Sequence, residues 1–98
     1  PGVAIGANGA CMMFGNIAPQ HSLDILSLAM NNQLEEAYNI HTSIIDADWH
    51  ILSSGAAGLK YALDLLGYQG GLPRNPMPEL DKAKKSLIRD SLRSSGLI

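Results

Sequence analysis

Three histidines, His21, His41 and His50, are the side chains most suited to binding a metal ion. Two metal ligands on one helical face normally stand four residues apart, whereas His41 and His50 are nine apart. Asp46 and His50 have the four-residue spacing, but nothing nearby supplies a third ligand. We therefore interpret them as a helix-surface pair and predict neither a metal site nor a bound cofactor.

Cys11 is the only cysteine, and with a distant histidine as base it could act as a nucleophile. Neither a cation nor a helix N-terminus is predicted beside it to favour the reactive thiolate, so we expect a buried, unreactive thiol. No serine–histidine–acid set or carboxylate pair stands out, and we predict no catalytic residue in these 98 residues. A lone cysteine excludes an internal disulfide and fits a reducing compartment, so we expect a cytoplasmic protein, with a mitochondrial location as the alternative.

The composition indicates a chain with too little polar surface. Of its 98 residues, 46% are hydrophobic and 16% charged, while globular domains usually carry about 25% charged residues. We infer that some of its apolar faces pack against something outside the chain. The net charge of −2 gives no electrostatic reason to expect nucleic acid, and no apolar run approaches the roughly 18 residues needed to span a bilayer.

The segment "GANGACMMFGNIAP", Gly6 to Pro19, contains the one candidate strand, Ala10 to Phe14. It is apolar without alternation, as strands of a buried parallel sheet are. Such a strand needs neighbours, and the chain contains no second candidate. We therefore expect the rest of its sheet to lie elsewhere.

Four helices should follow, and they would make the chain mostly α-helical. Pro19 suits the first turn of a helix, and Asp81 should cap the last one. The first helix is apolar on more than one face, so we expect it to be buried on two sides. The second carries apolar residues at the spacing of one helical face, namely Leu34, Ala37, Tyr38, Ile44, Ile45, Trp49 and Leu52. The expected ranges are Pro19–Met30, Leu34–Ser53, Ala56–Leu66 and Lys82–Ser94, with prolines and glycines keeping residues 68–80 irregular.

The ordered set of motifs resembles the C-terminal third of the dihydrodipicolinate synthase/N-acetylneuraminate lyase family. "GANGACMMFGNIAP" is similar to that family's last barrel strand and the entry to its last barrel helix. The other matching stretches are "NNQLEEAYNIHTSI", "GLKYALDLLGYQGGLPRNPMPEL" and "LRSSGLI". Within the family, "GLK…LGYQGG…R-x-P" looks closest to the 4-hydroxy-2-oxoglutarate aldolase-like branch.

The resemblance implies an α/β fold: the last strand–helix unit of a TIM (β/α)8 barrel in residues 1–33, and a C-terminal helical extension in residues 34–98. It also implies a class I aldolase or lyase in which a lysine on a middle strand forms a Schiff base with a pyruvate-type 2-keto acid. That strand is absent here, so we expect these residues alone to be inactive. Lys60 lies on a helix after the barrel, at a position that is structural in the family.

Active sites of such barrels lie at the C-terminal ends of the strands. The resemblance would therefore place Phe14 and Gly15 at the mouth of the pocket as substrate-binding residues, and Asn16 would anchor the following helix by a backbone hydrogen bond. The implied partners are the remainder of the barrel, a small keto acid, and further copies of the protein bound through the C-terminal helices.

The alternative is a small, self-contained helical interaction module without catalytic activity. In that case the four helices would close on themselves, and residues 10–14 would be buried as helix or loop.

Overall fold

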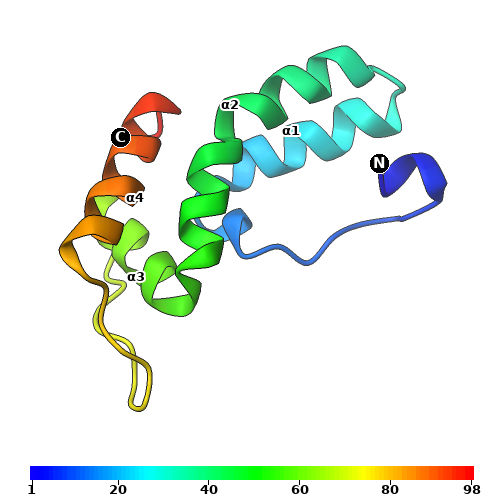
Figure 1. The fold of residues 1–98 in the computed structure, drawn as a ribbon. Coiled ribbons are helices and arrows are strands. Elements are labelled where there is room, and N and C mark those ends of the chain that lie inside the picture. The colour runs from blue at the N-terminus through cyan, green and yellow to red at the C-terminus, as the bar shows by residue number, and fades with distance from the viewer.

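The computed structural model describes residues 1–98, and every regular element in it is helical (Figure 1). Two single-turn 3₁₀ helices come first, and four α-helices follow. The elements are η1 (Val3–Ile5), η2 (Phe14–Asn16), α1 (Pro19–Met30), α2 (Leu34–Ser53), α3 (Gly55–Leu65) and α4 (Lys82–Ser94). No helix here combines the length and the hydrophobicity that a membrane span requires.

The predicted helices are confirmed, with the third shifted by one residue. α1 begins at Pro19, and α2 carries Glu35 and Glu36 in its first turn, where the helix dipole favours negative charge. Asn32, with φ of 59°, turns the chain between α1 and α2. The carboxylate of Asp81 accepts a hydrogen bond from the Lys84 N–H at 2.8 Å, as an N-cap residue does.

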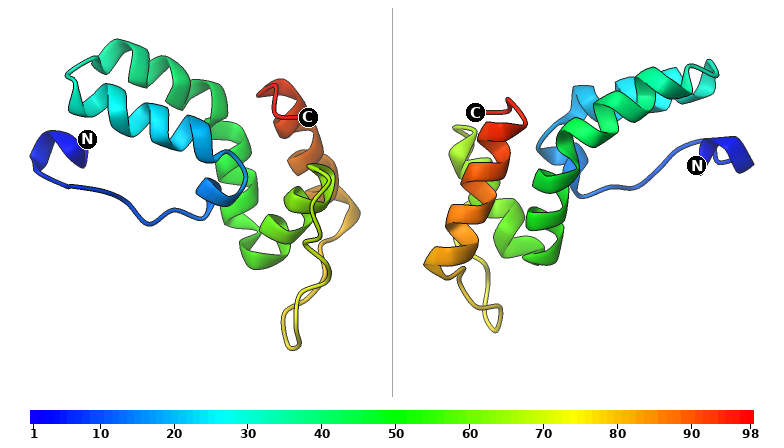
Figure 2. Two further views of the ribbon diagram at one scale, coloured as in Figure 1. Left: turned by 180° about the vertical axis from the view of Figure 1, so that it is seen from behind. Right: turned by 45° about the horizontal axis from the view of Figure 1, so that its top comes forward.

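α2 is the element that joins the two parts of the molecule. Its first half lies beside α1 and its second half beside α3 and α4, as both views of Figure 2 show. The core forms where η2, α2, α3 and α4 meet. Its buried members are Phe14, Ile17, Ala18, Ile44, Ala47, Ile51, Ala62, Ile88 and Leu92.

The expected strand at Ala10–Phe14 is wrong for this chain. Residues 10–12 have no regular structure, Phe14 starts η2, and only Phe14 of the five is buried. A strand is stabilised by hydrogen bonds to a neighbouring strand, and these 98 residues provide none. The expected α/β fold is therefore absent from this chain, whereas the expected α-helical content is present.

α1 and α2 also differ from expectation in what they bury. α1 contains no fully buried residue, so its expected burial on two sides is wrong here. The apolar residues of α2 form two stripes instead of one. Ala37 and Ile44 belong to a buried stripe, whereas Tyr38 and Trp49 are each 64% exposed.

The molecule has more surface than a closed domain of its size. Its accessible area is 6577 Å², whereas a compact monomer of 10.4 kDa exposes about 5,400 Å². Its radius of gyration is 14.4 Å, against about 13 Å for a compact chain of this length. Because only 13 of 98 residues are buried, the helices do not complete an interior of their own.

Candidate functional site

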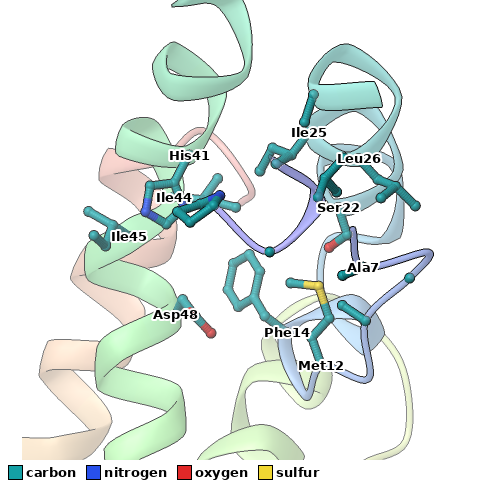
Figure 3. A pocket seen from close by; sticks show the side chains of 16 residues that line it. Ala7, Met12, Phe14, Ser22, Ile25, Leu26, His41, Ile44, Ile45 and Asp48 are labelled. Atoms are coloured by element: carbon teal, nitrogen blue, oxygen red, sulfur yellow. The ribbon is translucent and has the colours of Figure 1, made fainter. Parts of the chain in front are cut away.

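One apolar hollow of about 240 Å³, called the Phe14 hollow below, lies between the N-terminal segment, α1 and α2. Figure 3 shows Phe14 inside it, with Met12 beside Phe14, Ile25 and Leu26 on α1, and Ile44 on α2. Most of its walls are hydrocarbon, and its polar side chains are Ser22, His41 and Asp48. Such a lining suits the packing of apolar groups better than the stabilisation of charge.

Phe14, one of the two predicted substrate-binding residues, is held firmly at the end of the N-terminal segment. Its carbonyl accepts hydrogen bonds from the N–H groups of Ile17 and Ala18, at 2.9 and 3.0 Å. The Asn16 amide donates to the Met13 carbonyl at 3.0 Å, which precedes it, so its expected anchoring of the following helix stays a prediction. The Phe14 side chain is 1% exposed and joins the core, which leaves little of it for a ligand.

Gly15, the other predicted residue, faces a different hollow, formed with Pro19 and Leu23 of α1. A Cβ added at Gly15 would meet no atom within 4 Å, so the space beside it is open. The two predicted residues thus line two adjoining hollows, which share Ala10, Met12, Ser22 and Leu26. Their contact with a keto acid stays a prediction.

His41 and Asp48 are functional candidates that the sequence reasoning missed. They stand seven residues apart on α2, two helical turns, and both line the Phe14 hollow. Burial raises the pKa of the Asp48 carboxyl above its usual value, and nearby His41 opposes the rise. The feature of the sequence that could have identified them is their position between the two apolar stripes of α2. The spacing rule for metal ligands had instead selected Asp46 and His50.

The remaining candidates are dispersed. Cys11 is exposed, so its expected burial is wrong: without a sheet around it, the N-terminal segment lies on the surface. Asp46 is exposed and His50 is half-buried, consistent with a pair on the helix surface. No three histidine, cysteine, aspartate or glutamate side chains lie together as metal ligands would.

Lys60 is engaged in holding the irregular crossing of residues 68–80 on α3. Its ammonium donates to the Gly70 carbonyl at 2.7 Å. One turn later on α3, the Asp64 carboxylate accepts from the N–H groups of Gly70 and Gly71, at 2.7 and 3.2 Å. A lysine in this setting has a structural role, as the resemblance implied.

A second polar cluster joins α3 to α4. Arg89 donates a hydrogen bond to the Tyr61 hydroxyl at 2.7 Å, and the Lys85 ammonium lies 5.7 Å from the centre of the Tyr61 ring. These contacts fix the angle between two helices. They bring no nucleophile toward the Phe14 hollow.

Comparison with known proteins agrees with the resemblance. The model of the Dihydrodipicolinate synthetase family matches residues 1–95. A 4-hydroxy-tetrahydrodipicolinate synthase of Afipia carboxidovorans is 27% identical over 97 residues, which cover 98% of this chain and 33% of that protein. One of Methanocaldococcus jannaschii is 25% identical over 99 residues, covering 100% of this chain and 34% of that protein.

A third relative, the 4-hydroxy-tetrahydrodipicolinate synthase of Ralstonia nicotianae, is 27% identical over 95 residues, or 96% of this chain and 32% of that protein. The chain thus spans about a third of the length of the curated relatives it matches. These relatives carry the synthase name, and assignment to the 4-hydroxy-2-oxoglutarate aldolase-like branch stays a prediction. Because the family model matches nearly the whole chain, the chain belongs to the Dihydrodipicolinate synthetase family.

Proposed function

We propose that these residues are the C-terminal third of a barrel lyase that forms a Schiff base with a pyruvate-type 2-keto acid. The observation that carries this proposal is the match of the family model to residues 1–95, together with relatives three times as long. In this proposal residues 1–33 complete the barrel and residues 34–98 form a helical extension. The proteins named 4-hydroxy-tetrahydrodipicolinate synthase are the relatives from which the activity is inferred.

The side chains of these residues support a proposal in which the catalytic groups belong to the rest of the barrel. Schiff-base formation requires an available amine in a closed pocket, and the Lys60 amino group is instead engaged in a hydrogen bond to the Gly70 carbonyl. The hollow around Phe14 is apolar and has no amine side chain in its lining. We therefore assign the nucleophile to the remainder of the barrel and no catalytic residue to this chain.

In the complete barrel, residues 10–14 would find the strand neighbours that they lack here. They would then pair as a strand and carry Phe14 and Gly15 to the mouth of the pocket. Glycine at position 15 would leave room there, as the open space around it does in this structure. We therefore propose Gly15 as the main substrate contact. Phe14 would contribute through the packing of its ring.

Borohydride trapping with pyruvate tests the proposal. The complete polypeptide containing these residues should gain one covalent pyruvate adduct on reduction, located by peptide mass spectrometry outside residues 1–98. The 98-residue chain treated in parallel should gain none. An adduct on Lys60, or no adduct on the complete polypeptide, would overturn the assignment.

A Gly15→Val variant of the complete polypeptide tests the pocket-mouth position. It should raise the KM for the keto acid severalfold, because an isopropyl group would occupy the space. Ala4→Val, exposed on the same N-terminal segment and lining neither hollow, is the matched control. Equal kinetics for the two variants would remove Gly15 from the site.

A further inference from the structure

α4 carries most of the positive charge of the chain. Five of the seven lysines and arginines lie on this helix, together with one of the nine acidic residues. The helix therefore has a net charge of +4, whereas the rest of the chain has a net charge of −6. The whole-chain value of −2 hides this separation, and a local concentration of positive charge attracts anions.

Four of the five cations form one stripe along α4. We call it the cationic stripe; its members are Lys82, Lys85, Arg89 and Arg93, at spacings of three, four and four residues. At about 100° per residue they fall within an arc of roughly 80°, and Lys84, the fifth cation, lies about 140° from the middle of that arc. Like charges four residues apart destabilise a helix, so the stripe does not serve the stability of α4.

The carboxylates around the stripe are engaged with other groups. Asp90, the one acidic residue of α4, accepts a hydrogen bond from the Ser86 hydroxyl at 3.3 Å. Asp64 on α3 accepts from backbone N–H groups of the crossing. Asp64 and Glu79 line a small hollow of about 80 Å³ together with Lys85, but Arg89 is not among its lining residues. Arg89 is therefore the member of the stripe that we expect an external anion to approach most freely.

Tyr61 of α3 holds two members of the stripe in place. α3 and α4 lie side by side (Figure 1). Arg89 donates to the Tyr61 hydroxyl at 2.7 Å, and the Lys85 ammonium lies 5.7 Å from the centre of the Tyr61 ring. All three side chains are half-buried, so the two charges are positioned before any ligand arrives, which lowers the entropic cost of binding.

This cluster is rich in hydrogen-bond donors. Because the Tyr61 oxygen accepts from Arg89, the Tyr61 O–H can donate to a further group. Arg89 has four more N–H groups in a planar fork, and the Lys85 ammonium has three. Phosphate oxygens suit such a set, since a guanidinium binds them in pairs and hydrogen bonds between charged groups are the strongest.

We propose that Lys85, Arg89 and Tyr61 form a binding site for a phosphate anion of the size of pyrophosphate. Lys85 and Arg89 are about 6 Å apart along the helix axis, so each can bind one of two linked phosphates. Lys82 and Arg93 extend the positive field at the two ends. Lys85 already lies over the Tyr61 ring, so the site favours the phosphates themselves over the stacking of a nucleobase.

Lysine footprinting of the complete polypeptide tests the site. Acetylation of Lys85 and of Lys84 is timed by peptide mass spectrometry, with and without saturating pyrophosphate. Pyrophosphate should slow acetylation at Lys85 at least fivefold and at Lys84 less than twofold, because Lys84 lies on the other side of the same helix. Equal effects at the two lysines, or no effect at Lys85, would overturn the proposal.

Charge-matched variants of the complete polypeptide test the contact by titration calorimetry with pyrophosphate. Arg89→Gln should weaken binding at least tenfold, and Arg89→Lys should restore only part of it, because lysine keeps the charge but lacks the fork. Lys84→Gln removes the same charge and should change the affinity less than twofold. Equal weakening by Arg89→Gln and Lys84→Gln would show general attraction to α4 and would overturn the site.

A second variant guards against loss of the fold. Arg89→Gln also removes the hydrogen bond to Tyr61, whereas Lys85→Gln removes only a charge over the ring. Lys85→Gln should weaken pyrophosphate binding at least fivefold, with circular dichroism that matches the parent. Unchanged affinity in this folded variant would exclude Lys85 and, with it, the proposed site.

Citrate, which carries a similar charge at neutral pH, separates phosphate from carboxylate recognition. Pyrophosphate should bind at least tenfold more tightly, and equal affinities would overturn the assignment to phosphate. Pyruvate trapping on the same samples separates this inference from the proposed function. Pyrophosphate binding without trapping would leave the anion site and remove the keto-acid function, and trapping without pyrophosphate binding would do the reverse.

Discussion

The Lys60 ammonium donates a hydrogen bond to the carbonyl of Gly70 across 2.7 Å, and the backbone at Gly70 lies directly on the backbone of the same lysine. A Cβ built on Gly70 would come to 2.0 Å from the Lys60 carbonyl oxygen. Together with the Asp64 carboxylate, this contact holds the irregular crossing of residues 68–80 on α3. The lysine of this segment thus serves the fold.

Lys60→Met should weaken the fold without removing Schiff-base chemistry. A half-buried hydrogen bond from a charged donor is lost, at a cost of about 1–2 kcal/mol in the free energy of unfolding. Chemical denaturation followed by circular dichroism measures it, with Lys82→Met on the exposed start of α4 as the control. Loss of pyruvate trapping by folded Lys60→Met in the complete polypeptide would contradict the structural role.

Gly70→Ala should destabilise the chain by about 2–3 kcal/mol, because the new methyl group overlaps a backbone oxygen that cannot move independently. Gly15→Ala is the matched control, since a Cβ there meets nothing within 4 Å. Thermal melting of the two variants measures the difference. Equal melting temperatures would show that the crossing is not seated on α3 as described.

Asp81→Ala should cost about 1 kcal/mol of folding stability by removing the side-chain cap of α4, whereas Asp81→Asn should retain most of it. The free energies of unfolding of the two variants check this. A cap contributes through its hydrogen bond to the Lys84 N–H, so an equal loss in both would point to the charge of Asp81 instead.

Asp48→Asn should change how stability depends on pH. Burial raises the pKa of the folded Asp48 carboxyl, so the folded 98-residue chain holds this proton more tightly than the unfolded chain. The contribution of this bound proton to folding stability is therefore full below the pKa that Asp48 has in the unfolded chain. It is lost as the pH rises through the higher pKa of Asp48 in the folded chain. Replacing it with asparagine should raise the melting temperature at pH 7 more than at pH 4.

The control for this prediction is Asp46→Asn, on the exposed side of the same helix. Melting temperatures of the three proteins across pH 3–7 provide the measurement. If Asp48→Asn and Asp46→Asn follow the same curve, the hollow does not bury the Asp48 carboxyl.

The helices of this protein were predictable because their signals are local. Pro19 at a first turn, Asp81 at an N-cap and Gly67 after the last turn of α3 depend on backbone geometry within a few residues. The family resemblance was predictable for a similar reason, since the order of such signals along the chain does not require the barrel to be present.

The strand and the site could not be predicted for this chain in the same way. Ala10–Phe14 has the composition of a buried strand, but pairing depends on neighbours that these residues do not include. His41 and Asp48 come together at the hollow only because α1 and the N-terminal segment enclose that part of α2. A spacing rule for metal ligands had selected Asp46 and His50 instead, which share a helix turn but not a cavity.

The amino-acid sequence by itself determined where the helices begin and end and to which family the chain belongs. Capping groups, turn residues and the order of motifs act over short distances. Only the tertiary structure decided which apolar stripe of α2 is covered and which is left open, because both stripes consist of hydrophobic side chains. The choice depends on which elements exclude water from each face, and the stripe that contains Tyr38 and Trp49 stays largely exposed in these residues.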